Sequence, residues 1–186
     1  MRIAHYGTFD VENYGDLLFP LVLERRLAGR GHALVHVSPR GGEPVWGDCV
    51  ATIPTQAADR LDFEGAIVGG GHLIHAQPSD VAAYRDSAGG GLFAYADLWL
   101  GATLRAAALR VPIVWNAPGV PGTLPAETAA LLRWAVGEAA YLAGRDETSR
   151  GFLEQAGCTG EIAVVLDTAI EVARLWSPAE LDAAWA

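Results

Sequence analysis

The chain has 186 residues, of which 51% are hydrophobic, and its formal net charge at pH 7 is −9. Intrinsic disorder is excluded, because disordered segments combine low hydrophobicity with high charge. The sequence holds no Lys and no cluster of Arg, so we expect no duplex nucleic acid as a partner. The two cysteines, Cys49 and Cys158, stand in no ligand spacing, and we therefore expect neither a disulfide framework nor a zinc site.

The N-terminus and the most apolar stretch both favour a protein without a membrane segment. Residues 1–6 resemble a short strand and not a signal peptide, since no long apolar core and cleavage site follow. Residues 90–111 are strongly apolar, yet they include Asp97, Arg105 and Arg110, which a membrane span would not carry at that depth. We therefore expect a buried helix there and a cytoplasmic location for the protein.

Strand-like and helix-like segments alternate along the chain. In order, short apolar runs predict strands over residues 3–6, 34–37, 66–68, 112–115, 141–143 and 162–166. The segments between them predict helices over residues 17–30 and 92–108, from Pro125 onward, and over residues 146–156. Residues 76–91 have no clear period and contain a proline and three glycines, so a long loop is expected there.

Short, continuous apolar strands separated by helices are typical of a parallel sheet that is buried on both faces. The sequence therefore predicts an α/β fold with a doubly wound, mostly parallel sheet and helices on both faces, in one domain over residues 1–176. Residues 177–186 begin with Ser177, Pro178 and Glu180 in a capping-box spacing, which predicts a further helix. We expect this segment to be either a linker to a second domain or a short terminal helix.

Polar and glycine residues gather in the segments that follow the predicted strands. Because the carboxyl ends of parallel strands meet at one edge of the sheet, we expect a ligand site at that edge. In the first segment Asp16 is expected to cap the following helix, whereas Asn13 either forms a turn or contacts a ligand. Gly70 and Gly71 belong to a run of three glycines that lets the backbone approach a ligand closely.

Three further side chains at this edge are candidates for chemistry. His72 and His75 follow the glycines and suit a general acid or base, and in an extended loop they would not share a face. Arg145 follows the fifth predicted strand and directly precedes a helix, where it suits a phosphate or a carboxylate. An ion pair with Asp146 or Asp167 is the competing interpretation. No third metal ligand accompanies the two histidines, so no metal is expected.

Five blocks of the sequence resemble the polysaccharide pyruvyl transferase family. They comprise residues 7–16, 65–71, 116–119, 144–149 and 164–169, and they span nearly the whole chain. The resemblance implies transfer of a pyruvyl group from phosphoenolpyruvate to hydroxyls of a sugar or glycan as a ketal, in polysaccharide biosynthesis and without a cofactor. It also implies a GT-B-like fold of two Rossmann-like halves, of which this chain would be the first. His72 departs from the pattern, since the family more often has a small or amide residue there.

Within that resemblance, His72 or His75 would be the catalytic acid or base, and Arg145 would hold an anion. The other substrate-binding candidates are Asn13, Asp16, Gly70, Gly71 and Asn116. The asparagine and aspartate of the first loop would order that loop and hold acceptor hydroxyls. A second domain or a second copy would complete the cleft, so the chain alone is expected not to catalyse transfer. Two other functions stay open: half of a nucleotide-sugar glycosyltransferase, and a non-catalytic relative that binds a glycan or a partner.

Overall fold

A parallel sheet forms the centre of the molecule in the computed structural model, which describes residues 1–79, 81–85 and 93–185. The strands of this described part are β1 Arg2–Tyr6, β2 Ala33–Ser38, β3 Ile53–Pro54, β4 Gly65–Gly69, β5 Ile113–Asn116, β6 Tyr141–Gly144 and β7 Ala163–Val164. They are ordered β3-β2-β1-β4-β5-β6-β7, and each neighbouring pair is parallel. The predicted α/β fold with a doubly wound sheet is confirmed.

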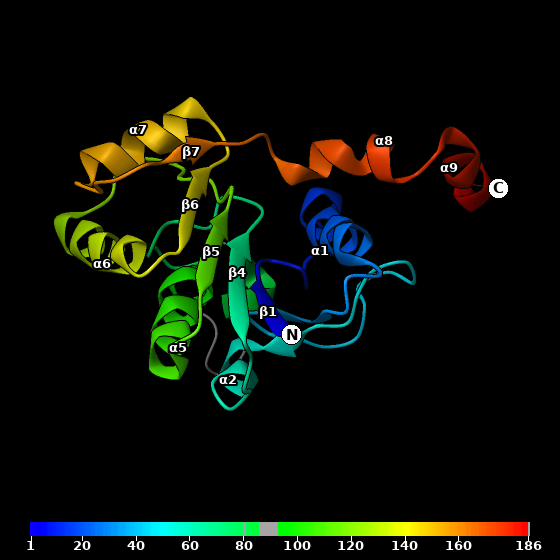
Figure 1. Cartoon of the computed structure of the whole chain (residues 1–186), viewed down its shortest axis with the longest axis horizontal. Helices are drawn as coiled ribbons and strands as arrows, with labels where there is room; N and C mark the ends of the chain where they lie inside the picture. The colour runs from blue at the N-terminus through cyan, green and yellow to red at the C-terminus, as the bar shows by residue number, and fades with distance from the viewer. Residues whose placement is uncertain (80, 86–92, 186) are drawn as a thin grey trace.

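Helices lie on both sides of this sheet, with α1 on one side and α5 and α6 on the other (Figure 1). The described helices are α1 Tyr14–Leu27, α2 Thr55–Ala58, α3 Ala82–Arg85, α4 Ala94–Ala96, the π-helical turn η1 Asp97–Gly101, α5 Ala102–Leu109, α6 Ala126–Gly137, α7 Glu147–Gln155, the 3₁₀ turn η2 Thr168–Glu171, α8 Val172–Leu175 and α9 Pro178–Trp185.

The core is built from alternating side chains of the central strands. Tyr6, Val68 and Trp115 are buried in one cluster with residues of η1, α5 and α6. The ring of Trp115 meets that of Trp99 edge to face, with centroids 6.2 Å apart. The opposite face of β1 is also buried, because His5 lies there with its Nδ1 atom 3.1 Å from Nδ1 of His36. Burial on both faces explains the continuous apolar runs of the sequence.

Several elements differ from the prediction. In the sequence, β3 and α2 follow β2 and precede β4, in a stretch where no element is predicted. β3 pairs with β2 through only two residues, which leave no recognisable apolar run. The predicted loop over residues 76–91 contains α3, whose Tyr84 is fully buried and donates a hydrogen bond to Oδ1 of Asp10 at 2.5 Å. Residues 80 and 86–91 of that loop lie outside the described residues. β7 is limited to two residues of the predicted 162–166.

The start of α1 requires a correction. Asn13, and not Asp16, is the N-cap: its backbone is extended, and its Oδ1 accepts a hydrogen bond from the Gly15 amide at 3.2 Å. The helix begins three residues before the predicted start, which places Asp16 in the first turn with its carboxylate available for other contacts. The cap predicted for α7 is confirmed, since Asp146 accepts a hydrogen bond from the Ser149 amide at 2.6 Å.

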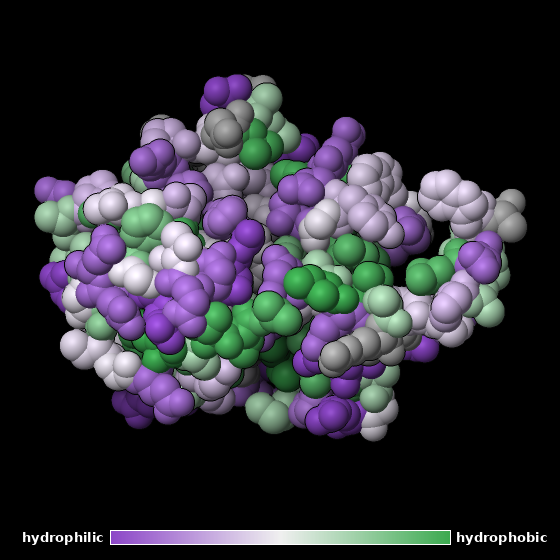
Figure 2. All heavy atoms as spheres, turned by 90° about the horizontal axis from the view of Figure 1, so that it is seen from above, coloured by the Kyte–Doolittle hydropathy of each residue, from purple (hydrophilic) through white to green (hydrophobic). Residues whose placement is uncertain are grey.

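The C-terminal residues form an arm of three short helices, η2, α8 and α9, that runs past α1 (Figure 1). The end of this arm also projects from the body of the molecule in the view from above (Figure 2). Ser177 and Glu180 form the predicted capping box, with reciprocal hydrogen bonds of 2.7 and 3.2 Å. Trp185 of α9 is 93% exposed. That this segment links to a second domain stays a prediction.

Candidate functional site

The sheet has a switch point between β1 and β4. From β1 the chain continues to β2 and β3 on one side of this point, and from β4 it continues to β5, β6 and β7 on the other side. The loops that leave β1 and β4 therefore run in opposite directions and open a crevice between them. A cavity of about 600 Å³ opens at this place, and we call it the edge pocket. Its described lining residues are Thr8, Asn13, Gly15, Asp16, Phe19, Gly71, His72, Tyr95, Arg145, Asp167, Ala169 and Ile170.

The carboxylate of Asp16 lies in the wall of the edge pocket. It accepts hydrogen bonds from the hydroxyl of Thr8 and from Nδ2 of Asn13, the latter at 2.9 Å. The missing side chain of Gly71 leaves room for it, because a Cβ at Gly71 would lie 2.8 Å from Oδ1 of Asp16. Burial raises the pKa of Asp16 to about 6, and the two hydrogen bonds offset only part of that rise. This carboxyl can therefore gain or release a proton near neutral pH.

His72 and Arg145 enter the same pocket and both pack against Gly119. A Cβ at Gly119 would lie 2.6 Å from Cδ2 of His72 and 2.7 Å from Cδ of Arg145. Arg145 also forms both ion pairs of the competing interpretation, with Nε 3.4 Å from Asp146 and Nη1 3.8 Å from Asp167. Burial, and then the charge of Arg145, lower the pKa of His72. Its imidazole is therefore largely neutral at pH 7 and able to accept a proton.

Backbone hydrogen bonds hold the loops of the site in place. The Gly119 amide donates to the carbonyl of Gly71 at 2.8 Å, and the Ile74 amide donates to the carbonyl of Gly119 at 3.1 Å. The amide of Val120 donates to Oγ of Ser149 in α7 at 3.1 Å. These contacts join the segments after β4 and β5 to the start of α7, and so they fix His72 relative to Arg145.

Two of the predicted site residues do not line the edge pocket. Gly70 has a φ of +86°, and a Cβ there would lie 2.2 Å from the ring of Phe19, so this glycine packs beneath α1. Asn116 is the last residue of β5 and not part of the following loop, because the strand continues one residue beyond its predicted end. Asn116 lines a separate cavity, together with His5 and Val22.

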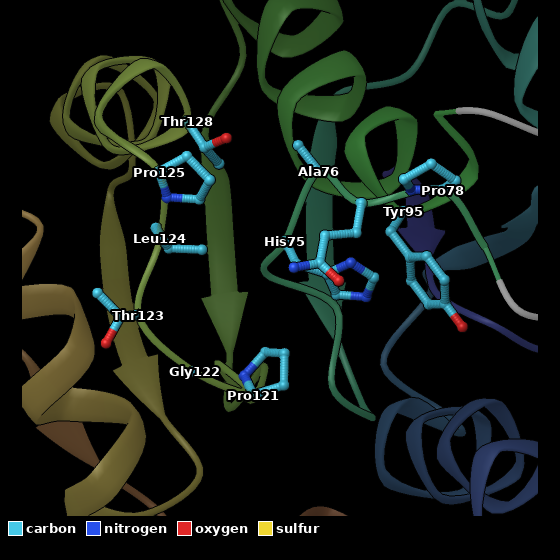
Figure 3. Close-up of a pocket in the computed structure, with 11 residues that line it drawn as sticks. His75, Ala76, Pro78, Tyr95, Pro121, Gly122, Thr123, Leu124, Pro125 and Thr128 are labelled. Carbon is cyan, nitrogen blue, oxygen red and sulfur yellow. The ribbon is translucent and has the colours of Figure 1, made fainter.

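His75 lies in a second cavity of about 400 Å³, the side pocket, between the segments that follow β4 and β5 (Figure 3). Its described lining residues are His75, Ala76, Gln77, Pro78, Tyr95, Pro121, Gly122, Thr123, Leu124, Pro125 and Thr128. The ring of His75 contacts that of Tyr95, with centroids 4.1 Å apart, and its carbonyl accepts a hydrogen bond from Nε1 of Trp99 at 3.0 Å. The two histidines therefore belong to different cavities. The segment between them is neither helix nor strand, and it turns at Ile74, where the His75 amide donates to the carbonyl of Leu73 at 3.0 Å.

Thr8 and Tyr95 also line the edge pocket, and neither was predicted from the sequence as a site residue. Thr8 directly follows Gly7 at the end of β1, and this position at the carboxyl edge is a signal that could have identified it. Tyr95 has no such signal, since its spacing places it on the apolar stripe of a predicted helix. Its ring lines both the edge pocket and the side pocket.

Within the described ranges, 1–79, 81–85 and 93–185, no group of three or more His, Cys, Asp or Glu side chains is arranged to hold a metal ion. None of the helices in these ranges is both long enough and apolar enough to cross a membrane.

Comparison with known proteins gives a family match. The sequence model for polysaccharide pyruvyl transferases matches residues 13–183. No curated protein matches the chain significantly. Among solved structures, a DJ-1 superfamily protein from Agrobacterium tumefaciens is 17% identical with a TM-score of 0.45, over 99% of this chain and 95% of that one. That similarity is too low to support a functional conclusion. The family match, by contrast, spans nearly the whole chain and all of the edge pocket except Thr8, so this chain belongs to the polysaccharide pyruvyl transferase family.

Proposed function

We propose that this domain holds a sugar acceptor in the edge pocket and promotes transfer of a pyruvyl group to it from phosphoenolpyruvate. One observation carries the proposal: Asn13, Asp16, His72 and Arg145, which are distant in sequence, line a single cavity at the switch point of the sheet. These four residues also fall within the range matched by the family. The cavity volume lies in the usual range of small-molecule sites, roughly 300–1,000 Å³.

The polar groups of the pocket suit the hydroxyls of a sugar. A carboxylate accepts hydrogen bonds only, whereas the amide of Asn13 both donates and accepts them, so the pair matches hydroxyl groups in either role. Asn13 and Asp16 are already hydrogen-bonded to each other, which fixes their orientation before a ligand arrives. Asp167 also lines the pocket and adds a second carboxylate. We propose that these three side chains orient the acceptor.

Two groups with opposite pKa perturbations would move the protons. A hydroxyl oxygen of the acceptor bonds to C2 of phosphoenolpyruvate while His72 takes the hydroxyl proton and Asp16 gives a proton to the C3 methylene. A second hydroxyl then displaces phosphate from the same carbon, and its proton leaves with the phosphate. The products are a cyclic ketal and inorganic phosphate. The assignment follows from a pKa that is raised at Asp16 and lowered at His72.

Arg145 would contact one anionic group of phosphoenolpyruvate. It is the only Lys or Arg among the described residues that line the edge pocket, and Asp146 and Asp167 already offset its charge. Its longer ion pair, to Asp167 at 3.8 Å, is the one that a substrate carboxylate would replace more easily. We propose that further cations needed for phosphoenolpyruvate lie outside this pocket, as the two-domain arrangement implied by the resemblance would provide.

The test is an activity assay on the full-length protein. Phosphoenolpyruvate labelled with ¹³C at C2 is incubated with a panel of neutral sugars, and phosphate release is measured together with the NMR signal of the labelled carbon. We expect phosphate release only when both substrates are present, with the label in a ketal. His72→Gln and Asp16→Asn should each lower the rate by about 10²–10⁴-fold. Arg150→Ala, at a partly exposed position on α7 outside the pocket, should not.

Two further measurements on the same protein, consumption of nucleotide sugars and binding of glycans, distinguish the two other functions. Consumption of a UDP- or GDP-sugar without any effect of phosphoenolpyruvate would identify a nucleotide-sugar glycosyltransferase. Binding of a glycan without consumption of either donor would identify a non-catalytic relative.

A further inference from the structure

We propose that the side pocket is a subsite for a second, uncharged sugar residue, so that the acceptor is at least a disaccharide lying across Tyr95. The inference rests on the proposed function, because it takes the edge pocket as the place of the reacting sugar. It assigns a role to a cavity that the reaction itself does not use.

The two cavities are neighbours that share one wall. The segment from Gly71 to His75 places His72 in the edge pocket and His75 in the side pocket. Tyr95 lines both cavities, so its ring stands where a ligand would pass from one to the other. In Figure 3 the hydroxyl of Tyr95 is turned toward the side of the blue helix α1, and its ring lies next to His75. A chain of two sugars would therefore contact this ring at the linkage between them.

The lining of the side pocket suits a neutral sugar ring. Its described residues include no Asp, Glu, Lys or Arg, in contrast to the edge pocket. Gln77 and Thr123 are exposed side chains that donate and accept hydrogen bonds, and Pro121 and Leu124 add apolar surface. A sugar ring has hydroxyls at its edge and C–H groups on its faces, so it needs this combination of polar groups and an aromatic surface.

A nucleobase would also fit an aromatic ring beside an amide, but its position would then be unfavourable. A nucleotide with its base in the side pocket would place its phosphates toward the edge pocket. Arg145 is the single Lys or Arg among the described residues that line the edge pocket, and the proposed function assigns it to phosphoenolpyruvate. No cation of this lining then remains for the phosphates of a nucleotide, whereas an uncharged glycan needs none.

One glycine gives a direct way to close the side pocket. A Cβ at Gly122 would meet no atom within 4 Å, and its backbone is not in the left-handed region, so a side chain can begin there without a clash or backbone strain. Gly122→Phe should therefore fill the cavity. Gly137 is a matched control, because it is equally open and lies at the far end of α6, the helix whose start lines the pocket.

The experiment measures binding by titration calorimetry, with no phosphoenolpyruvate present. The probes are the methyl glycosides of glucose, galactose and mannose and the neutral disaccharides that contain them. We expect at least one disaccharide to bind about tenfold or more tightly than its methyl glycoside. Gly122→Phe should abolish that gain and leave monosaccharide binding unchanged, whereas Gly137→Phe should preserve it. Gln77→Ala should reduce the gain by about three- to tenfold, as expected for one hydrogen bond.

Three results would overturn the subsite. They are a panel without any disaccharide preference, a preference that survives Gly122→Phe, and displacement of a bound disaccharide by uridine or guanosine. Failure of the proposed function is a separate result: no ketal forms from labelled phosphoenolpyruvate, yet the preference for disaccharides remains. Failure of the subsite alone would show ketal formation at equal efficiency on monosaccharides and disaccharides.

Discussion

Replacement of Asp16 by asparagine should stabilise the fold at neutral pH. Burial raises the pKa of Asp16 from 3.8 to about 6 in the folded chain. At about 1.4 kcal/mol per pH unit, this difference corresponds to roughly 3 kcal/mol of lost stability once the carboxyl is ionised in both states. The asparagine keeps the shape of the side chain but carries one oxygen instead of two, so at most one of the hydrogen bonds from Thr8 and Asn13 is lost, a change of about 1 kcal/mol. The net expectation is a gain of roughly 2 kcal/mol at pH 7.5.

The pH dependence of this gain identifies its cause. Well below pH 3.8 the carboxyl is protonated in the folded and the unfolded chain, so ionisation contributes nothing. As the pH rises from about 4 to about 6, the unfolded chain loses this proton first, and the stability of the wild-type chain falls relative to the variant. Above pH 6 the difference is constant. At pH 4.5 the variant should therefore show little gain, or a small loss from the missing hydrogen bond.

Urea denaturation at several pH values measures this directly, with tryptophan fluorescence as the signal and the free energy of unfolding as the result. Asp146→Asn is the control at the neighbouring carboxyl, because the hydrogen bond from the Ser149 amide lowers the pKa of Asp146. That variant should gain no stability at neutral pH. A destabilised Asp16→Asn at pH 7.5 would refute the reasoning, since it would mean that the ionised carboxylate is favoured by its surroundings.

Three further outcomes are expected. Arg145→Ala should weaken binding of phosphoenolpyruvate or sulfate by about 1.5–3 kcal/mol with little change in melting temperature. The control variant Arg150→Ala should alter neither quantity. A lower melting temperature with unchanged anion binding would assign Arg145 a structural role. Gly70→Ala should lower the free energy of unfolding, measured in urea, by about 2–4 kcal/mol, because its Cβ would meet the ring of Phe19 and its φ is +86°. The control variant Gly15→Ala in α1 should not lower it. NMR titration should find His5 neutral at pH 6, because burial and the neighbouring imidazole lower its pKa well below the ordinary value, and a midpoint at 6.5 would contradict this.

The sequence predicts the central strands well because burial on both faces leaves a plain physical signal. β1, β4 and β5 read as short continuous apolar runs that end in glycine or a polar residue. β3 carries no such signal, since it pairs through two residues at the edge of the sheet. Its position depends on tertiary contacts with β2, which no local pattern contains.

The sequence predicts those residues of the candidate site whose position follows from the order of strands in the sheet. Asn13, His72 and Arg145 follow different strands, and the parallel sheet brings them to one edge. The environment of Asp16 was not predictable, because its raised pKa depends on close packing against Gly71 and on burial by distant loops. The sequence favours a capping role for it, since a short acidic side chain before an apolar helix usually has one. Asn13 takes that role instead.

The segment from His72 to His75 separates the edge pocket from the side pocket, and this affects how the ligand specificity of each pocket can change by mutation. His72 and His75 are three residues apart in one segment, and each belongs to a different cavity. A substitution at either position can change one compartment and leave the other intact. A deletion or insertion of one residue between them would shift both side chains and break the hydrogen bonds of the segment to Gly119. Point substitutions can therefore tune each compartment separately, while the length of this segment must stay constant.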